Sequence, residues 1–237
     1  MSCHSQIEGD SLSTLQNNGK IFEGSRFPAV VKIMADDGGT CTGTNMGPYI
    51  LTAAHCVEVA LGDSVYSPLD AQKIQVSMDG GKSLMRASQV ELAPGYKNDR
   101  IWKYDLAKIR LTGSATTSHA KASLGAPAVK GSAVTVVGFG CTFDCNNSVS
   151  TDHGVLRSGL NNVAKVSELI EIVGPSQTQS SPGQTVAYPG DSGGPLFDAR
   201  GEVVGVLTRT ATFDGQTISS YVNVNDPSNK AFVQGSN

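Results

Sequence analysis

Short runs of alternating apolar and polar residues recur along the chain, and clusters of glycine, proline, asparagine and aspartate separate them. The first set of runs occupies residues 29–34, 49–53, 73–78, 89–92 and 106–111. The second set occupies residues 133–139, 168–173, 202–209 and 220–224. Many short strands at this spacing are typical of a β-sandwich or a closed barrel, and not of alternating strand and helix units. The pattern therefore predicts an all-β protein.

A stretch rich in serine, threonine, alanine and glycine, residues 112–131, separates the two sets and has the composition of a connector. A length of 237 residues suits one domain with two packed halves. We therefore expect an N-terminal half at about residues 21–112 and a C-terminal half at about residues 131–225. A short helix with Asp226 or Ser228 as its N-cap is predicted near the end of the sequence.

Composition and charge limit the classes of partner. Charged residues make up 16% of the chain, against a usual level of about a quarter, and 27 residues are glycine, as suits a β protein rich in turns. The net charge of -3 arises from mixed signs without long runs, so we expect neither a nucleic-acid partner nor a polybasic membrane contact. The apolar runs are too short to span a bilayer, and none reads as a signal peptide, so we expect any export signal to have been removed.

The five cysteines fall into two local groups, Cys41 with Cys56 and Cys141 with Cys145, and leave Cys3 alone. Two disulfides formed in an oxidising compartment fit this grouping, and so do five reduced thiols in a cytosolic protein. No metal site is expected. Cys141 and Cys145 have a ligand-like spacing, but no second Cys or His pair lies nearby to complete a tetrahedral zinc site.

Three segments carry the groups that let a hydroxyl attack a peptide bond. Such an attack needs a base that takes the proton, a carboxylate that orients the base, and donors for the oxyanion. The first segment is LTAAHC, in which small residues leave the ring of His55 accessible. The second is DLAKIRL, which begins with Asp105 at the start of an apolar strand. The third is GDSGGP around Ser192, whose glycines allow a tight turn with inward N–H groups.

These segments resemble the signatures of the trypsin and chymotrypsin family of serine endopeptidases. The resemblance covers about residues 21–224, keeps the order His, Asp, Ser and includes the cysteine ahead of the histidine motif. It implies two six-stranded antiparallel Greek-key barrels with the active site between them. It also implies a catalytic triad in which Ser192 is the nucleophile, His55 the general base and then acid, and Asp105 the orienting carboxylate.

The resemblance implies three further properties of the site. The backbone N–H groups of Gly190 and Ser192 form the oxyanion hole, and a disulfide joins Cys41 to Cys56 beside the base. These roles need no metal or organic cofactor. The expected partners are protein or peptide substrates, which an acyl-enzyme mechanism cleaves.

In the resembling family, the acid before the nucleophile pairs with a new amino terminus that proteolytic cleavage releases. Here that acid is Asp191, and Lys20 followed by Ile21 resembles the cleavage site. Residues 1–20 are polar and poor in bulky apolar groups, so we interpret them as a leader or propeptide. An activating protease is thus a possible partner, and residues 21–237 are the expected protease domain.

The specificity pocket is assigned by the same resemblance. The position six residues before the nucleophile forms the pocket floor, which is an acid in trypsin-like members and is Val186 here. Thr208, Arg209 and Thr210 match the segment whose backbone pairs with the substrate as an antiparallel strand. Thr210 is expected to narrow the entrance, and Ser219 to lie on the third wall. We therefore expect a preference for uncharged, small to medium apolar residues before the scissile bond.

The expected location is secreted or periplasmic, in keeping with the disulfides. Cys3 is then a leftover thiol, a partner for another chain, or a lipid-bearing residue similar to the first residue of a bacterial lipoprotein.

Several alternatives accompany this interpretation. The GDSGG string also fits the nucleophile elbow of α/β-hydrolases, but that fold needs a catalytic histidine after the serine, and every histidine precedes Ser192. Asp99 competes with Asp105 as the acid, and the apolar strand after Asp105 favours the latter. The same acyl chemistry serves an ester hydrolase. A catalytically silent protease-like binding protein, or a permanently inactive zymogen, would keep the fold without turnover.

Overall fold

The structure is a computed structural model of the chain. It describes residues 26–36, 38–62, 65–79, 83–96, 101–113, 118–140, 154–175 and 183–235. It also describes two short antiparallel strands near the start, β1 (Glu8–Gly9) and β2 (Leu12–Ser13). The rest of the predicted leader, including the proposed cleavage site at Lys20 and Ile21, lies outside the described residues.

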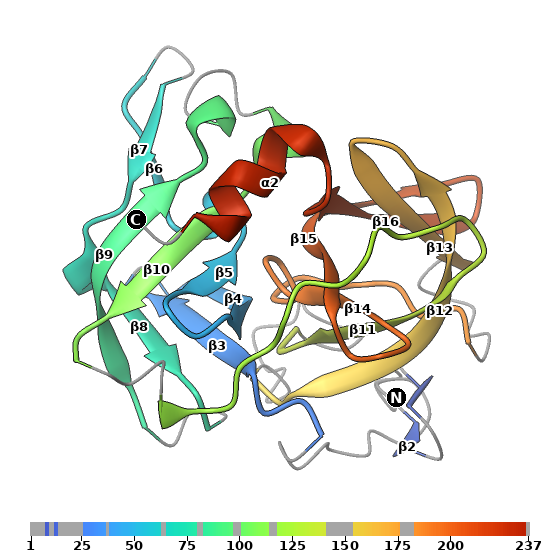
Figure 1. Ribbon diagram of the computed structural model, residues 1–237, viewed down its shortest axis with the longest axis horizontal. Helices are drawn as coiled ribbons and strands as arrows, with labels where there is room; N and C mark the ends of the chain where they lie inside the picture. The colour runs from blue at the N-terminus through green and yellow to red at the C-terminus, as the bar shows by residue number, and fades with distance from the viewer. Residues whose placement is uncertain are drawn as a thin grey trace.

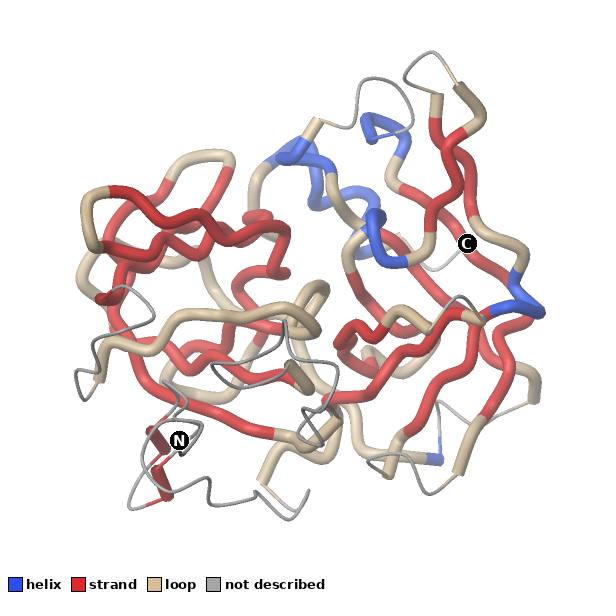
Figure 2. Tube along the Cα trace, turned by 180° about the vertical axis from the view of Figure 1, so that it is seen from behind, coloured by secondary structure: helices blue, strands red, loops and turns tan. Residues whose placement is uncertain are grey.

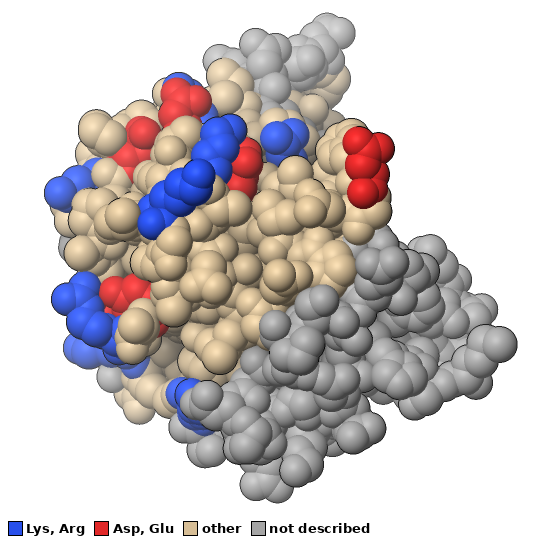
Figure 3. Space-filling view, turned by 90° about the vertical axis from the view of Figure 1, so that its right-hand side faces the viewer, with Lys and Arg blue, Asp and Glu red and all other residues tan. Residues whose placement is uncertain are grey.

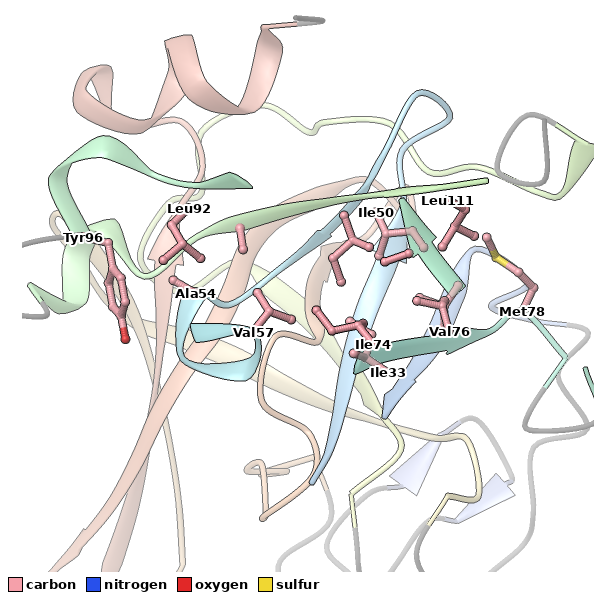
Figure 4. Close-up of a cluster of buried hydrophobic side chains, with 14 residues drawn as sticks. Ile33, Ile50, Ala54, Val57, Ile74, Val76, Met78, Leu92, Tyr96 and Leu111 are labelled. Carbon is pink, nitrogen blue, oxygen red and sulfur yellow. The ribbon is translucent and has the colours of Figure 1, made fainter. Parts of the chain in front are cut away.

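Six antiparallel strands form a closed N-terminal barrel in the order β10-β5-β4-β3-β8-β9 (Figure 1). Their bounds are β3 (Val30–Ala35), β4 (Thr40–Asn45), β5 (Ile50–Thr52), β8 (Ile74–Ser77), β9 (Met85–Leu92) and β10 (Ala107–Leu111). Alternate residues of these strands point inward, because successive side chains of a strand face opposite sides. Ile33, Ile50 and Ile74 thereby meet in a core with almost no exposed surface (Figure 4).

Six further antiparallel strands close a C-terminal barrel in the order β11-β12-β13-β16-β15-β14. Their bounds are β11 (Ala133–Gly138), β12 (Arg157–Val166), β13 (Leu169–Pro175), β14 (Pro195–Asp198), β15 (Val203–Phe213) and β16 (Gln216–Asn223). Figure 2 shows the two groups of strands from behind. The predicted all-β fold with two six-stranded barrels is confirmed.

The remaining elements are short. They are the 3-10 turns η1 (Ala54–Cys56), η2 (Ala71–Lys73), η3 (Pro94–Tyr96) and η4 (Trp102–Tyr104), the hairpin of β6 (Glu58–Ala60) and β7 (Tyr66–Pro68), and helix α2 (Pro227–Gln234). The predicted helix and its cap are confirmed, because the Asp226 carboxylate accepts the Ser228 N–H at 2.9 Å. None of the helices in the described ranges is long and apolar enough to cross a membrane.

Among the barrel strands, the sequence pattern missed β4, β12 and β14. The sequence of β4 is TCTGTN, and its last four residues are buried although they include threonine and asparagine. Buried hydroxyl and amide groups are stable when they find hydrogen-bond partners, and such residues do not produce an apolar alternation. A hydrophobicity pattern therefore does not predict β4, although this strand forms hydrogen bonds to the turn that carries Ser192.

The barrels meet through a shared apolar cluster. Leu51 and Leu106 come from the N-terminal barrel side, and Val206 and Val222 from the C-terminal barrel, and all four are buried. Helix α2 adds Val233 to this cluster. On the outer face of the C-terminal barrel, basic and acidic side chains lie near one another (Figure 3). The buried apolar cluster therefore holds the two halves together.

Candidate active site

The buried carboxylate of Asp105 holds His55 through two hydrogen bonds. Asp105 follows η4 directly and has no exposed surface, whereas the His55 side chain in η1 is 19% exposed. The backbone N–H of His55 donates to Oδ1 at 2.9 Å, and Nδ1 lies 2.7 Å from Oδ2. Because an ionised carboxylate only accepts, the Nδ1 atom carries the proton in this pair. The Nε2 atom of His55 is then the free base.

A third donor comes from the other barrel. The Thr208 hydroxyl in β15 donates to Oδ2 of Asp105 at 2.5 Å, and Thr208 is 3% exposed. The sequence places Thr208 in the substrate-binding strand, whereas its side chain contacts the carboxylate. A single sequence gives no signal for this bond, because the two residues are 103 positions apart.

The segment that carries Ser192 is a tight turn packed against the N-terminal barrel. Gly193 has φ +78°, and a Cβ atom there would lie 2.1 Å from Oγ1 of Thr52, so only glycine fits. The N–H of Gly193 donates to the Leu207 carbonyl at 2.9 Å. The Ser192 carbonyl accepts the Thr42 N–H at 2.8 Å. These contacts fix the backbone on both sides of the hydroxyl.

Two N–H groups of this turn are left open. The N–H groups of Asp191, Gly193 and Gly194 donate to backbone carbonyls. Within the described ranges, those of Gly190 and Ser192 have no acceptor, and neither residue is fully buried. Both N–H groups are therefore accessible, and an open pair of donors on one turn is suited to an incoming anionic oxygen.

The backbone of Ser192, whose side chain carries the hydroxyl, lies beside the turn of His55, since the Sγ atom of Cys56 is 3.6 Å from the Ser192 carbonyl oxygen. In the described part of the chain no hydrogen bond joins this hydroxyl to the His55 ring. Nucleophile–base contacts are often long in ligand-free sites and tighten when substrate binds.

The predicted disulfide between Cys41 and Cys56 is confirmed, with an S–S distance of 2.03 Å. It ties β4 to the turn that carries His55. Among the described residues, the only trio of potential metal ligands is Cys41, His55 and Cys56, whose ligand atoms lie within 4.8 Å of one another. Thiolates bind metals, and the two sulfurs are bonded to each other instead. Cys3, Cys141 and Cys145 lie outside the described residues.

Asp191 is a second buried carboxylate, directly before Ser192, and is 1% exposed. It accepts the N–H of Gly140 at 2.7 Å and that of Tyr188 at 2.9 Å. Burial raises the pKa of Asp191 to about 6, although both N–H bonds and the Arg157 guanidinium act in the opposite direction. Two neutral donors thus stabilise the charged form only in part.

A cavity of about 370 Å³ opens beside Ser192. It is lined by Ala187, Tyr188, Pro189, Ser192, Leu207, Arg209, Thr210, Ala211 and Thr212. No carboxylate belongs to this set of described lining residues.

Of the predicted pocket residues, Arg209 and Thr210 line the cavity. Val186 does not belong to this lining and is fully buried. Ser219 lies behind the wall, where its hydroxyl accepts the Ala187 N–H at 2.9 Å and is 3.4 Å from Oγ1 of Thr210.

Comparisons with known proteins agree with the two-barrel fold. The family model described as Trypsin matches residues 17–231. A Glu endopeptidase solved in complex with MPD has a TM-score of 0.64 at 17% identity, covering 88% of this chain and 90% of that chain. Neuropsin, a serine protease expressed in the limbic system of mouse brain, has a TM-score of 0.62 at 17% identity, covering 90% of this chain and 94% of that chain. No curated protein matches the chain at a significant level.

The raised pKa of Asp191 predicts a specific pH dependence of stability. Between the usual pKa of 3.8 and about 6, the unfolded chain releases this proton while the folded, uncleaved chain keeps it. The free energy of unfolding should therefore fall as pH rises through this window, by on the order of 3 kcal/mol. Urea unfolding at pH 4 to 7 of the wild type and of Asp191→Asn isolates the effect. A difference between the two proteins that does not change with pH would contradict it.

Proposed function

This chain belongs to the trypsin family and is a serine-type endopeptidase, and we propose that His55, Asp105 and Ser192 are its catalytic triad. The observation that carries this assignment is the Asp105–His55 pair, with Nδ1 to Oδ2 at 2.7 Å, beside the turn of Ser192. Asp99, the competing acid, lies outside the described residues. The position and bonds of Asp105 support it as the orienting acid.

In the proposed mechanism, Oγ of Ser192 attacks the carbonyl carbon of the scissile peptide bond, and Nε2 of His55 takes its proton. The new oxyanion accepts hydrogen bonds from the open N–H groups of Gly190 and Ser192. His55 then gives the proton to the leaving amine, the C–N bond breaks, and an acyl-enzyme remains on Ser192. Water, deprotonated by His55, attacks the acyl carbon, the C–Oγ bond breaks, and His55 returns the proton to Oγ of Ser192 as the acid product leaves. Asp105 stays ionised and stabilises the imidazolium.

We propose that the cavity beside Ser192 binds the side chain on the acyl side of the scissile bond. Its volume of about 370 Å³ lies within the usual range of ligand pockets. A lysine or arginine there would lose its water without a carboxylate partner, at a cost of several kcal/mol. Arg209 on the lining adds like-charge repulsion. Uncharged, small to medium apolar side chains are the proposed substrates, and Thr210 restricts large aromatic ones.

We propose that cleavage after Lys20 activates the enzyme. Among the described residues, the carboxylate of Asp191 has only neutral N–H donors at hydrogen-bond distance, and an ammonium group at Ile21 would supply an opposite charge. A charge buried without such a partner is costly, so the ion pair would stabilise the turn that follows Asp191. The disulfide between Cys41 and Cys56 supports a secreted or periplasmic location for this zymogen.

The triad prediction is a set of three substitutions. Ser192→Ala and His55→Ala should each lower kcat by roughly 10⁴ to 10⁶, because the triad acts as a unit, and Asp105→Asn should lower it by about 10⁴. Peptide hydrolysis and fluorophosphonate labelling measure the effect, and thermal unfolding checks that the variants fold. Asp99→Asn is the matched control. If that control were crippled and Asp105→Asn were fully active, the acid would be misassigned.

The activation prediction concerns the amino terminus. The mature enzyme should begin at Ile21, and Lys20→Gln should block activation by a trypsin-like protease. Amino-terminal sequencing of the protein that reacts with a fluorophosphonate probe, before and after limited trypsin digestion, tests this directly. Full activity of a chain that still begins at Met1 would exclude activation at Lys20.

The specificity prediction concerns the residue before the scissile bond. A panel of peptides varied only at this position should be cleaved fastest with Ala, Val or Leu and slowest with Arg or Lys. The activating protease is then a different enzyme, because cleavage after Lys20 would not suit this pocket. A clear preference for Arg or Lys would overturn the pocket assignment and leave the triad untouched.

A further inference from the structure

The buried hydroxyl of Thr42 in the N-terminal barrel forms a hydrogen bond to the turn that carries Ser192. Thr42 lies in β4 and has no exposed surface. Its Oγ1 atom accepts the N–H of Phe139 at 2.9 Å and donates to the carbonyl of Gly190 at 2.9 Å. A hydroxyl has one proton, so the Phe139 donor directs that proton to Gly190. The direction of the contact is therefore fixed.

The backbone of Thr42 makes a second contact with the same turn. Its N–H donates to the carbonyl of Ser192 at 2.8 Å. Thr42 thus holds the carbonyl groups of Gly190 and Ser192, the two residues whose N–H groups have no acceptor in the described ranges. Thr42 is itself anchored, because the Thr52 hydroxyl donates to its carbonyl at 2.8 Å.

Gly190 needs such an anchor more than an ordinary residue does. It has φ +95°, and a Cβ atom there would lie 2.9 Å from the Cα of Gly140, so the position requires glycine. Glycine has access to more backbone conformations than any other residue, and its N–H direction is correspondingly easy to change. The carbonyl of Gly190 belongs to the peptide group that follows Gly190, so a bond to it from a buried, fully paired hydroxyl restricts backbone rotation at Gly190 and thereby the direction of the preceding N–H.

We propose that Thr42 is a positioning residue for the oxyanion hole, in addition to the triad. Its hydroxyl holds the carbonyl of Gly190 and its backbone N–H holds that of Ser192, so that the N–H groups of these two residues both reach the oxyanion in the transition state. This inference rests on the proposed function, because it requires that these N–H groups bind an oxyanion. It assigns a catalytic consequence to a side chain that does not contact substrate.

Thr42→Val removes the hydroxyl and keeps the branched shape. We expect kcat to fall by about 10-fold to 100-fold, less than the roughly 10² to 10³ lost when an oxyanion donor itself is removed. KM should change by less than about 3-fold. The scissile carbonyl oxygen is neutral in the bound substrate and becomes anionic only in the transition state, so the oxyanion hole affects mainly kcat. Affinity for a peptidyl trifluoromethyl ketone, which forms an anionic hemiketal on Ser192, should fall in parallel with kcat. Thr42→Ser should restore both.

Thr44→Val is the matched control, because Thr44 is also buried and lies two residues further along β4. It should keep kcat within about 3-fold. Unchanged kcat in Thr42→Val, an equal loss in Thr44→Val, or a loss of kcat without loss of ketone affinity would each overturn the proposal. If Thr42→Val does not fold, Thr42→Ala, which leaves room for water, is tested against Thr42→Ser by the same two measurements. A wild-type protein that neither hydrolyses peptides nor reacts with fluorophosphonate, both before and after cleavage at Lys20, would refute the proposed function instead.

Discussion

The carboxylate of Asp105 has no contact with solvent, and the arrangement of the two barrels depends on satisfying it. Taking an ionised carboxylate out of water costs several kcal/mol unless donors replace the lost hydration. Two donors come from His55 in the N-terminal barrel segment, and the third is the Thr208 hydroxyl from the C-terminal barrel. Undocking the barrels would remove Thr208 and expose the apolar cluster between them. Docking of the two barrels and orientation of the His55 ring by Asp105 are therefore coupled.

At Ser192, the N-terminal barrel in turn donates hydrogen bonds to the C-terminal barrel. There the donor is Thr42 of the N-terminal barrel, and the acceptors are carbonyls of Gly190 and Ser192 in the C-terminal barrel segment. The N-terminal barrel side thus supplies His55 and Asp105, and the C-terminal side supplies Ser192. Each side also supplies a hydroxyl that bonds a group of the other side, Thr42 to Gly190 and Thr208 to Asp105. Both hydroxyls are buried, so water competes little for their partners. Neither half alone holds a complete site.

The contacts of the Thr42 and Thr208 hydroxyls could not be predicted from the sequence, whereas other features could. The apolar alternation and the LTAAHC, DLAKIRL and GDSGGP segments predict the barrels, the helix cap and the Cys41–Cys56 bridge, because each depends on local patterns or a known signature. The roles of Thr42 and Thr208 depend on which atoms tertiary packing brings together, which no local pattern encodes. Pocket walls raise the same difficulty: Val186, expected at the floor, is fully buried and not part of the cavity lining, while Ala187 lines it.

The two buried carboxylates beside Ser192 differ in what surrounds them, and this difference bears on activation. Asp105 has a histidine that can become cationic, together with a hydroxyl and an N–H. Within the part of the chain that the structure describes, Asp191 has two backbone N–H groups within hydrogen-bond distance, with Arg157 as a more distant charge. Neutral donors compensate a buried charge incompletely, and the pKa of Asp191 rises to about 6 for that reason. A new ammonium group at this point would lower the pKa of Asp191 and stabilise the turn that follows it. The proposed cleavage would thus favour the active conformation of that turn.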